Sequence, residues 1–459
     1  MSLLLTIQAA HGGLKVASEG INVVGHNTAN ATSDGYSRRT MVSTAAHPLQ
    51  RGGHWLGQGA KTMQFLRQSD VFVERQIVKN HGQQTRAKTA FESIRMLEAQ
   101  LSDGAKGSLV EGYNHFIDSL KQLTEDPGDT IFRSQLLTDA ENFTNSVQEV
   151  GRFLDDRQQS VREDLELAMS EINALSESIA EHNRRIRRSS NTMSNSDLID
   201  QRDRLIAEVS KLIGVEVHFK ADNQATVFFN GHPLVQGIGS RDLSYSEDSV
   251  GRPVFFLETN SGQIDVTAGL KGEFGGKLDA YDASQDLLDD LDTFVIDFST
   301  DFNTQHASGF DLNGNAGGDF FSFNSIAPTT SFSVDSTLLS DVTLIAAAGA
   351  ATAEYGDRDN LDLLLDIDEV AMFSSGAYTP RQFLTSIYAD LAKKVAENEM
   401  DYEMYTTQIT DMFDLRSSIS GVDLDQEAMK LMEYQASYEA AARVLTVSNQ
   451  LLGELMQLL

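Results

Sequence analysis

The sequence predicts a multidomain α+β protein with paired coiled-coil helices at its termini, a bundle of long helices forming a rod, and an inserted β-rich domain. Three observations support this prediction. Apolar residues repeat with a heptad period at both ends of the 459-residue chain, central stretches keep a helical period, and the residues after Gly214 alternate as in β-strands. A chain of this length is sufficient for roughly two to four packed domains.

The N-terminal residues predict the first helix of the coil. Apolar or small residues recur at alternating steps of four and three residues, which is the spacing of a heptad seam. The seam positions are Leu3, Ile7, Ala10, Leu14, Ala17, Ile21, Val24, Thr28 and Ala31. The polar, turn-rich residues 33–35 predict the end of this helix.

The C-terminal residues repeat this spacing, with leucine at nearly every second position. Their seam positions are Leu424, Ala428, Leu431, Gln435, Tyr438, Ala442, Leu445, Asn449, Leu452, Met456 and Leu459. Asp423 occupies the N-cap position, and Gln426, three residues later, gives a capping-box pattern. A polar residue in such a seam sets the register of the helix pair, so Asn449 is expected to be buried between its leucine neighbours.

The matching seams predict that the two terminal helices pair with each other. The alternative is two separate amphipathic helices, each in its own core. A second apolar stripe on the C-terminal helix, at Val444, Val447, Leu451 and Leu455, needs a further partner because it would otherwise face water. The expected assembly interface consists of Leu3, Ile7, Leu14, Ile21, Val24, Leu424, Leu431, Tyr438, Leu445, Asn449, Leu452, Met456 and Leu459.

The central part of the chain predicts helices on either side of a β-rich insertion. Helical periods run from Asp70 to about Gly214, interrupted by a turn at 126–128, and return over 277–304 and from Thr379 to Arg416, with Pro380 as the first helical residue. Strands are predicted at 215–219, 225–229, 254–257 and 263–266, with a hairpin turn at Asn230-Gly231. The predicted domains are a terminal coil (1–36 with 423–459), a helical rod (37–214 with 270–308 and 376–422) and a β-rich outer domain (215–269 with 309–375).

The composition is that of a folded, acidic protein. Apolar residues make up 41% of the chain, charged residues 22%, and the formal net charge is -31. Because such a surface repels nucleic acid and anionic membranes, we expect neither as a partner. The chain has no cysteine, which excludes disulfides, thiolate metal sites and cysteine nucleophiles. With no membrane-span-length apolar run and no secretory signal, composition alone favours a cytoplasmic protein.

No arrangement of residues predicts an enzyme, a cofactor site or a metal site. The histidines are scattered, and no phosphate loop, dinucleotide fingerprint or nucleophile elbow is present. Residues 311–319 resemble the start of a calcium loop, but Ala316 and Ser322 stand where an EF-hand needs glycine and glutamate. This favours a tight turn built on Asp311, with a calcium-dependent adhesin or enzyme as the alternative. The arginines at 184–188 predict a solvated helix face paired with Glu177 and Glu181.

Several segments resemble the flagellar axial proteins, the family of rod, hook and hook-associated proteins. Residues 26–38, which read HNTANATSDGYSR, are similar to the N-terminal signature of this family, although Thr28 stands where isoleucine is usual. Residues 170–186, 197–203 with 209–210, and 303–321 narrow the resemblance to the hook-associated proteins of the hook–filament junction. Residues 420–425 and 434–445 are also similar, so the resemblance spans nearly the whole chain.

The resemblance implies a structural subunit that is secreted to the extracellular flagellum. It implies export, unfolded, through the flagellar type III apparatus, with a chaperone covering the C-terminus before export. It further implies helical assembly with copies of itself between the hook protein and hook-associated protein 3. The alternative within the family is another axial protein, such as hook-associated protein 3 or the hook protein, in which we do not expect the segment 172–203.

Overall fold

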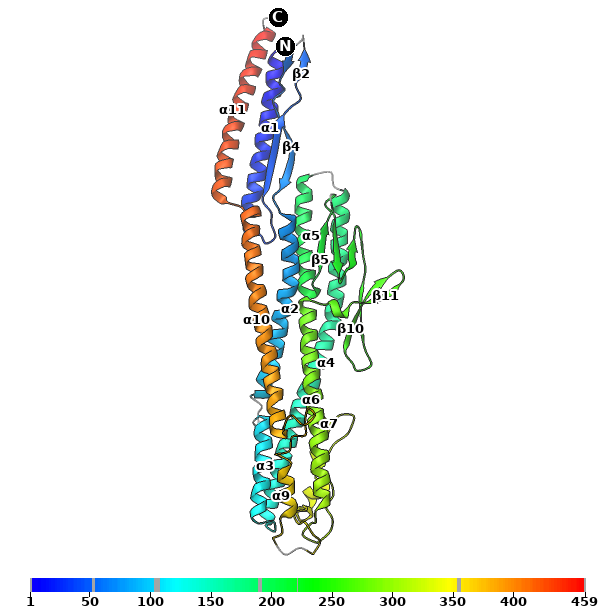
Figure 1. Cartoon of the computed structure of the whole chain (residues 1–459). Helices are drawn as coiled ribbons and strands as arrows, with labels where there is room; N and C mark the ends of the chain where they lie inside the picture. The colour runs from blue at the N-terminus through cyan, green and yellow to red at the C-terminus, as the bar shows by residue number, and fades with distance from the viewer. Residues whose placement is uncertain are drawn as a thin grey trace.

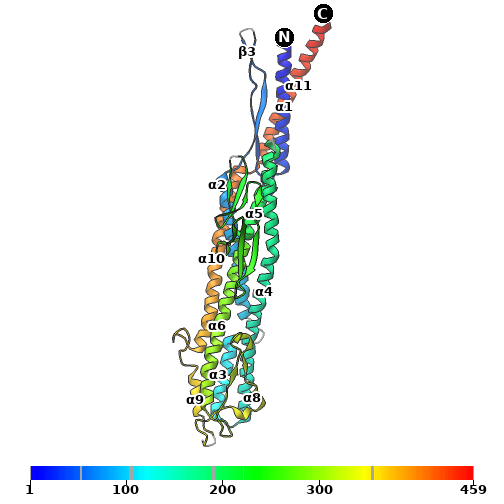
Figure 2. The ribbon, with the colours of Figure 1, turned by 90° about the vertical axis from the view of Figure 1, so that its right-hand side faces the viewer.

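The protein is a long rod with both chain termini at one end (Figures 1 and 2). The computed structural model describes residues 2–51, 54–102, 108–188, 192–220, 222–352 and 356–457. Three parts follow one another along the rod: a terminal coil, a helical bundle with small sheets on its side, and a distal end built partly from short elements (Figure 1). The predicted α+β multidomain class is confirmed.

The terminal coil consists of two helices from opposite ends of the chain. α1 (Ser2–Ala29) and α11 (Leu424–Gln457) lie side by side, which confirms that the termini pair (Figure 1). The carboxylate of Asp423 accepts hydrogen bonds from the backbone N–H groups of Asp425 and Gln426 and so caps α11. The side chain of Gln426 instead accepts from Arg38, so only the N-cap half of the expected capping box forms as predicted.

A β-ribbon stands beside this coil, and its existence corrects the prediction that the helical rod begins at residue 37. In the ribbon, β1 (Arg39–Ala45) pairs antiparallel with β4 (Ala60–Arg67), and β2 (Leu49–Arg51) pairs with β3 (His54–Leu56). Neither face of the ribbon is deeply buried, and its sequence therefore lacks the strong alternation of apolar and polar residues that identifies a strand.

The rod is a bundle of long helices, of which α4 has 59 residues. Its members are α2 (Val71–Ser102), α3 (Leu109–Glu125), α4 (Thr130–Arg188), α5 (Thr192–Ile213), α6 (Gly272–Ser308) and α10 (Pro380–Ser420). The predicted turn at 126–128 separates α3 from α4. Thr379 and Gln382 form a reciprocal capping box at the start of α10, with Pro380 in the first turn as predicted.

Two small antiparallel sheets cover the side of the bundle near α4 and α5 (Figure 1). The first follows the order β5-β6-β7-β8 and the second β11-β10-β9. Their strands are β5 (Glu216–Phe219), β6 (Ala225–Phe229), β7 (His232–Gln236), β8 (Gly239–Ser240), β9 (Leu243–Glu247), β10 (Pro253–Thr259) and β11 (Gly262–Asp265). Asn230 and Gly231 have φ values of 46° and 77°, as the predicted two-residue hairpin turn requires.

The segment after α6 corrects a second prediction, because 309–375 is not β-rich and does not join 215–269. Its strands β12 (Phe321–Ser322) and β13 (Ser333–Val334) have two residues each. Its helices are α7 (Pro328–Ser331), α8 (Ser336–Ser340) and α9 (Asp359–Asp366). The apolar residues of this segment pack with α3, α4 and α6 in a distal core, whereas the sheets share a separate core with α4 and α5.

Phenylalanine rings hold the distal core together. Phe298 on α6 has no exposed surface, and its ring centroid lies 5.6 Å from that of Tyr113, 5.7 Å from that of Phe321 and 5.3 Å from that of Phe294. These rings come from the helices and from the irregular segment alike. Apolar residues that are buried in loops imitate a strand in composition, which explains the incorrect β assignment.

Replacing Phe298 with alanine should lower the free energy of unfolding by about 3–5 kcal/mol, because a buried ring is lost and a cavity remains. Urea unfolding followed by circular dichroism measures this change. Leu167→Ala on α4 is the control, since Leu167 is 75% exposed and its truncation should change stability by less than about 0.5 kcal/mol. Equal effects of the two substitutions would contradict the assignment of the core.

His81 on α2 makes the stability of the rod sensitive to acid at the end next to the coil. Its ring contacts Phe413 of α10 at 5.5 Å, and burial, with the nearby Lys211, lowers its pKa to about 4. The unfolded chain has a histidine pKa of about 6.5. The folded protein therefore favours the neutral ring. The stability that this ring contributes is fully present above pH 6.5 and is lost as the pH falls towards 4.

Because the histidine at position 81 takes up a proton more readily in the unfolded chain, we expect it to reduce the free energy of unfolding by about 2 kcal/mol when the pH falls from 7 to 5. Urea denaturation at the two pH values measures the fall in the wild type and in His81→Leu, which should show a fall smaller by that amount. His115→Leu is the matched control, because the side chain of His115 is 66% exposed. An unchanged pH dependence in His81→Leu would show that the ring is not held neutral.

Candidate assembly interface

α1 is shaped to let α11 approach closely. A β-carbon added at Gly20 would lie 2.7 Å from the ring of Tyr434, and one added at Gly13 would lie 3.5 Å from the β-carbon of Ala441. The first distance is shorter than any ordinary contact, so only glycine allows Tyr434 to pack there. Residues with small or absent side chains thus fix how closely the terminal helices can pack.

The predicted interface residues fall into two groups. On α1, Ala10, Ala17 and Val24 are buried, while Leu3, Ile7, Leu14 and Ile21 are half-buried. On α11, the half-buried residues are Leu431, Leu445 and Leu452, and the exposed ones are Leu424, Tyr438, Asn449 and Met456. Leu459 lies outside the described residues.

The prediction that Asn449 is buried in the seam is wrong, because α11 is rotated from the predicted orientation. Ser448 is buried, with 4% of its surface exposed, and Glu427 is 1% exposed, whereas Asn449 and Ala428 face solvent. The buried positions 427 and 448 therefore lie one residue before the predicted positions 428 and 449, while the predicted leucines at 431, 445 and 452 are half-buried. The buried residues Glu427 and Ser448 are polar, and the residues that meet glycines of α1 are Ala441 and Tyr434, so apolar periodicity could not reveal this face.

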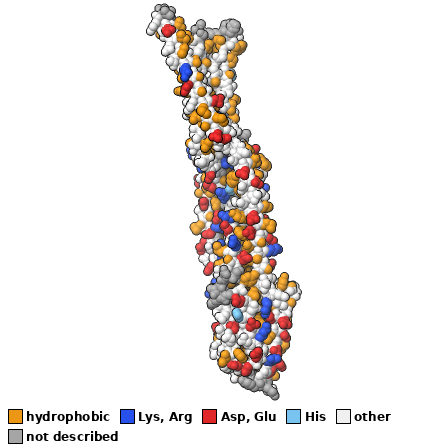
Figure 3. Space-filling view, turned by 90° about the vertical axis from the view of Figure 1, so that its left-hand side faces the viewer, with side chains coloured by type: hydrophobic (Ala, Val, Ile, Leu, Met, Phe, Trp, Pro, Cys, Tyr) orange, Lys and Arg blue, Asp and Glu red, His pale blue; other side chains and the backbone are white. Residues whose placement is uncertain are grey.

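α11 leaves an apolar stripe uncovered, as predicted. Val444, Val447, Leu451 and Leu455, called here the outer stripe, are 44–53% exposed. Figure 3 shows hydrophobic side chains gathered over this end of the molecule, while charged side chains are frequent along the rod. Four large apolar residues on one helix, next to the seam, form a surface that favours burial against another molecule.

A buried polar joint connects the coil to the rod. Asn27 on α1 donates from its amide to the carbonyl oxygen of Arg39 and accepts from the N–H of Arg39, both at 2.9 Å. The same amide donates to Glu427 of α11 at 3.0 Å, and the hydroxyl of Tyr36 donates to the Asn27 oxygen at 2.7 Å. Burial raises the pKa of Tyr36 to about 12, so this hydroxyl keeps its proton at physiological pH.

Arginine–carboxylate pairs tie this joint to α5. The guanidinium of Arg39, which is fully buried, contacts Asp197 at 2.5 Å and Asp200 at 3.3 Å. Arg67 of the ribbon contacts Asp200 at 2.8 Å and Asp203 at 3.1 Å. Burial lowers the pKa of Arg67, but the carboxylates of Asp203, Asp200 and Glu74 outweigh this effect, and its pKa is raised overall. Paired charges of this kind fix an orientation more than they add stability.

The joint brings together three segments that the sequence presents separately. The signature at 26–38 supplies Asn27 and Tyr36, the segment 197–203 supplies its aspartates, and α11 supplies Glu427. Arg416 of α10 completes it by contacting Glu74 at 2.9 Å and the carbonyl oxygen of Gly35 at 3.1 Å. Each of these segments resembles the family on its own, and no local pattern in the sequence predicts that they meet.

The way Asn27 binds Arg39 recurs at three other helix–segment junctions. In each, the carboxamide of a helical asparagine accepts from a backbone N–H and donates to a backbone carbonyl of the adjoining segment, an arrangement we call an asparagine clamp. Asn173 of α4 clamps Leu243, Asn183 of α4 clamps Ala225, and Asn303 of α6 clamps Phe321, all at 2.8–3.0 Å. All three lie in the middle segments that carry the family resemblance.

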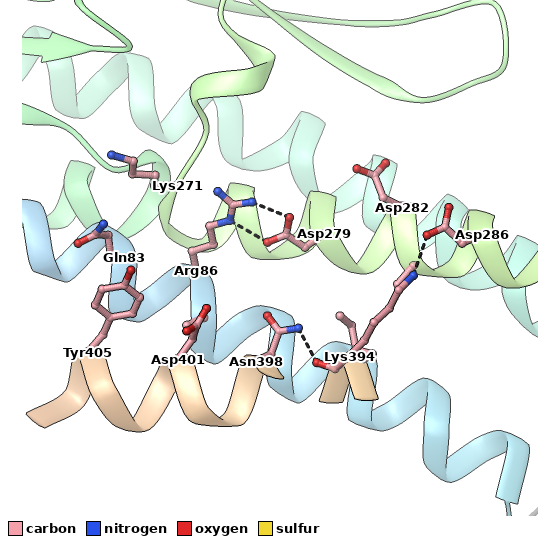
Figure 4. Close-up of a pocket in the computed structure, with 13 residues that line it drawn as sticks. Gln83, Arg86, Lys271, Asp279, Asp282, Asp286, Lys394, Asn398, Asp401 and Tyr405 are labelled. Carbon is pink, nitrogen blue, oxygen red and sulfur yellow. Dashed lines mark hydrogen bonds and ion pairs between the residues drawn. The ribbon is translucent and has the colours of Figure 1, made fainter. Parts of the chain in front are cut away.

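The polar groove in Figure 4 lies between α2, α6 and α10 and has a volume of about 380 Å³. Arg86 binds Asp279 through two hydrogen bonds of 2.7 and 2.8 Å, and Lys394 binds Asp286 at 2.7 Å. These charges are paired across neighbouring helices, and the arrangement therefore braces the bundle rather than presenting a nucleophile with an adjacent base.

The loop that resembles a calcium site is a tight turn, as favoured above. The carboxylate of Asp311 accepts from the N–H groups of Asn313 and Asn315 at 2.7 and 2.8 Å, and Gly314 has a φ of 79°. Among the described residues, no group of three histidine, aspartate or glutamate side chains is placed to hold a metal ion. In the same part of the chain, no helix is long and apolar enough to cross a membrane.

Two protein-family models match the chain. The model described as the flagellar hook-associated protein FlgK helical domain matches residues 94–321, and the one described as flagellar basal body rod FlgEFG protein C-terminal matches residues 416–458. The first covers the end of α2, the helices α3 to α6 and the two sheets. The second covers α11 and the end of α10.

Known proteins are similar over nearly the whole chain. Flagellar hook-associated protein 1 of Escherichia coli (strain K12) is 26% identical, covering 98% of this chain and 99% of its own length. The protein of the same name from Bacillus subtilis (strain 168) is 21% identical over 99% of this chain and 98% of its own. The flagellar hook junction protein FlgK from Burkholderia pseudomallei has the same fold, with a TM-score of 0.67 and 14% identity over 75% of this chain and all of that one.

Neutralising Glu427 should loosen the coil without melting the rod. Glu427→Gln weakens bonds to Arg38 and Asn27 in a buried site, and losing a charge-assisted hydrogen bond costs about 2 kcal/mol. We expect amide hydrogen exchange in α11 to become about 30-fold faster, while α4 and α6 keep their protection. Glu433→Gln, on the exposed face of the same helix, is the control and should leave exchange unchanged. Equal exchange rates in both variants would refute the claim that Glu427 holds α11 in place.

Proposed function

The chain belongs to the flagellar hook-associated protein 1 family, and from this we propose that it is a structural subunit forming the junction between hook and filament in the bacterial flagellum. It works outside the cell as a component of the flagellum and performs no catalysis. Copies of the chain assemble around a central channel through the terminal coil, with the hook protein on one side and hook-associated protein 3 on the other.

The observation that carries this proposal is the uncovered outer stripe on α11. One face of α11 packs on α1, and the next face exposes four large apolar residues to water. A helix that keeps two apolar faces while only one is covered in the single chain is suited to an assembly in which neighbouring copies cover the other. The joint supports the same role, because it holds the coil at a fixed orientation on the rod.

We also infer how the chain is exported to the hook–filament junction. The chain leaves the cell through the flagellar type III export apparatus, and a dedicated chaperone covers the C-terminal helix beforehand. The absence of cysteine suits such a route, since no disulfide can form in transit. The outer stripe gives the chaperone an apolar surface to cover, and this protection prevents assembly inside the cell.

Replacing Leu445 with aspartate should abolish assembly while leaving the rod folded. Leu445 is half-buried against α1, and burying a leucine contributes roughly 1.5–3 kcal/mol, whereas a carboxylate there must be desolvated or the helices must part. Cells that lack the native gene and carry Leu445→Asp should build hooks without filaments and release flagellin into the medium. The secreted variant should be a soluble monomer with the thermal melt of the wild-type rod.

Electron microscopy of hooks and a count of filaments per cell measure this outcome. Thr446→Asp is the matched control: it places the same charge one residue away, on an exposed position of α11, and should support normal filaments. Filaments of normal number in the Leu445→Asp cells would show that this seam does not drive assembly. Normal swimming of cells that lack the gene altogether would contradict the proposed position in the flagellum.

A further inference from the structure

The β-ribbon exposes large apolar side chains at the same end of the molecule as the coil. Trp55, the only tryptophan of the chain, is 66% exposed, Met63 is 64% exposed, and Leu49 and Leu56 are 43% and 37% exposed. We call these four residues the ribbon patch. In the described part of the chain, β1 pairs only with β4 and β2 only with β3. A two-stranded ribbon of this kind is marginal in water by itself and leaves its edges open to a partner.

The ribbon differs in charge from the rest of the molecule. On a chain with a net charge of -31, no aspartate or glutamate occurs between Asp34 and Asp70. Three arginines of this stretch are held in the joint, and Lys61 points into solvent. By contrast, α11 has five acidic residues and two basic ones, and Glu433 and Glu454 are exposed. The ribbon therefore brings no acidic side chain against α11, so no like-charge repulsion opposes its approach to this acidic helix.

The ribbon and α11 lie against α1 at the same height but on different sides of it. A β-carbon added at Gly12 would meet the carbonyl oxygen of Ala60 at 2.7 Å, and one added at the next residue, Gly13, would meet Ala441. Successive residues of a helix point about 100° apart. Figures 1 and 2 both show α1 with the ribbon on one side and α11 on another. Within one copy, the ribbon patch and the outer stripe are therefore separated by α1.

We propose that the ribbon patch of one copy docks on the outer stripe of α11 of the next copy, an inference that rests on the proposed assembly. The contact joins two different surfaces of the same chain, so each copy offers one surface to each neighbour. Such a head-to-tail contact repeats around an axis into a ring or a helix. It covers both apolar surfaces that a single copy leaves in water, and it places a ribbon without acidic residues next to the acidic helix.

The cysteine-free chain allows a direct test by disulfide cross-linking. Two double variants are made, Met63→Cys with Val447→Cys and Trp55→Cys with Leu451→Cys, so that one pair probes the middle of the ribbon and the other its tip. Flagella are isolated from cells that lack the native gene and carry each variant, oxidised, and analysed on non-reducing gels. We expect dimers and higher multiples of this chain in at least one variant, at a level more than tenfold above the control.

The control pairs Met63→Cys with Thr446→Cys in place of Val447→Cys. Thr446 is exposed and points about 100° away from Val447 around α11, so this variant should remain monomeric. Filament number in the same cells reports the proposed function separately. If filaments form and both double variants remain monomeric, the docking proposal is overturned while the proposed function stands. A disulfide within one chain, visible as a shift in gel mobility without a rise in mass, would also overturn it. If cells that lack the native gene form no filaments when they carry the wild-type chain, both the docking proposal and the proposed function are contradicted.

Discussion

The asparagine clamp is the interaction on which the rest of this structure depends. A rod of long helices satisfies its own backbone, but every segment that leaves the helices must find partners for its N–H and carbonyl groups. Four helical asparagines, Asn27, Asn173, Asn183 and Asn303, each supply a donor and an acceptor to such a segment. They fix the ribbon, the two sheets and the distal segment against α1, α4 and α6. The apolar cores pack the sheets and the distal segment on the helices, and the clamps fix the backbone where each segment meets its helix.

In this molecule, polar contacts of the joint orient the coil, whereas apolar cores stabilise the rod. The two cores of the rod are apolar and are complete without the coil, whereas the coil is attached through Asn27, Arg39, Glu427 and the aspartates of α5. Buried ion pairs add little stability relative to apolar packing, but their geometry is specific. The coil is therefore oriented by polar contacts, and the outer stripe of α11 remains exposed.

The sequence predicted the features that repeat along the chain and missed those that depend on contacts between distant segments. The terminal helices, the capping residues Asp423 and Thr379, and the Asn230-Gly231 turn follow from local patterns, and the structure confirms them. The rotation of α11 could not be predicted, because its buried positions Glu427 and Ser448 are polar and the fit of Tyr434 on Gly20 depends on a contact between distant segments. The ribbon and the distal segment were misassigned for the same reason: exposed strands and buried loops lack the periodicity that identifies an element.

The pairing of α1 with α11 has a consequence for the order of events in folding. Asn27 and Glu427, which bond directly, are 400 residues apart in the chain. Local helices form early, but a contact over such a separation requires nearly all of the intervening chain to be present. A truncated or incompletely delivered chain can therefore fold much of its rod and still lack the coil. The terminal coil therefore acts as a check on completeness: only a whole chain can form the coil and present the outer stripe at its proposed position.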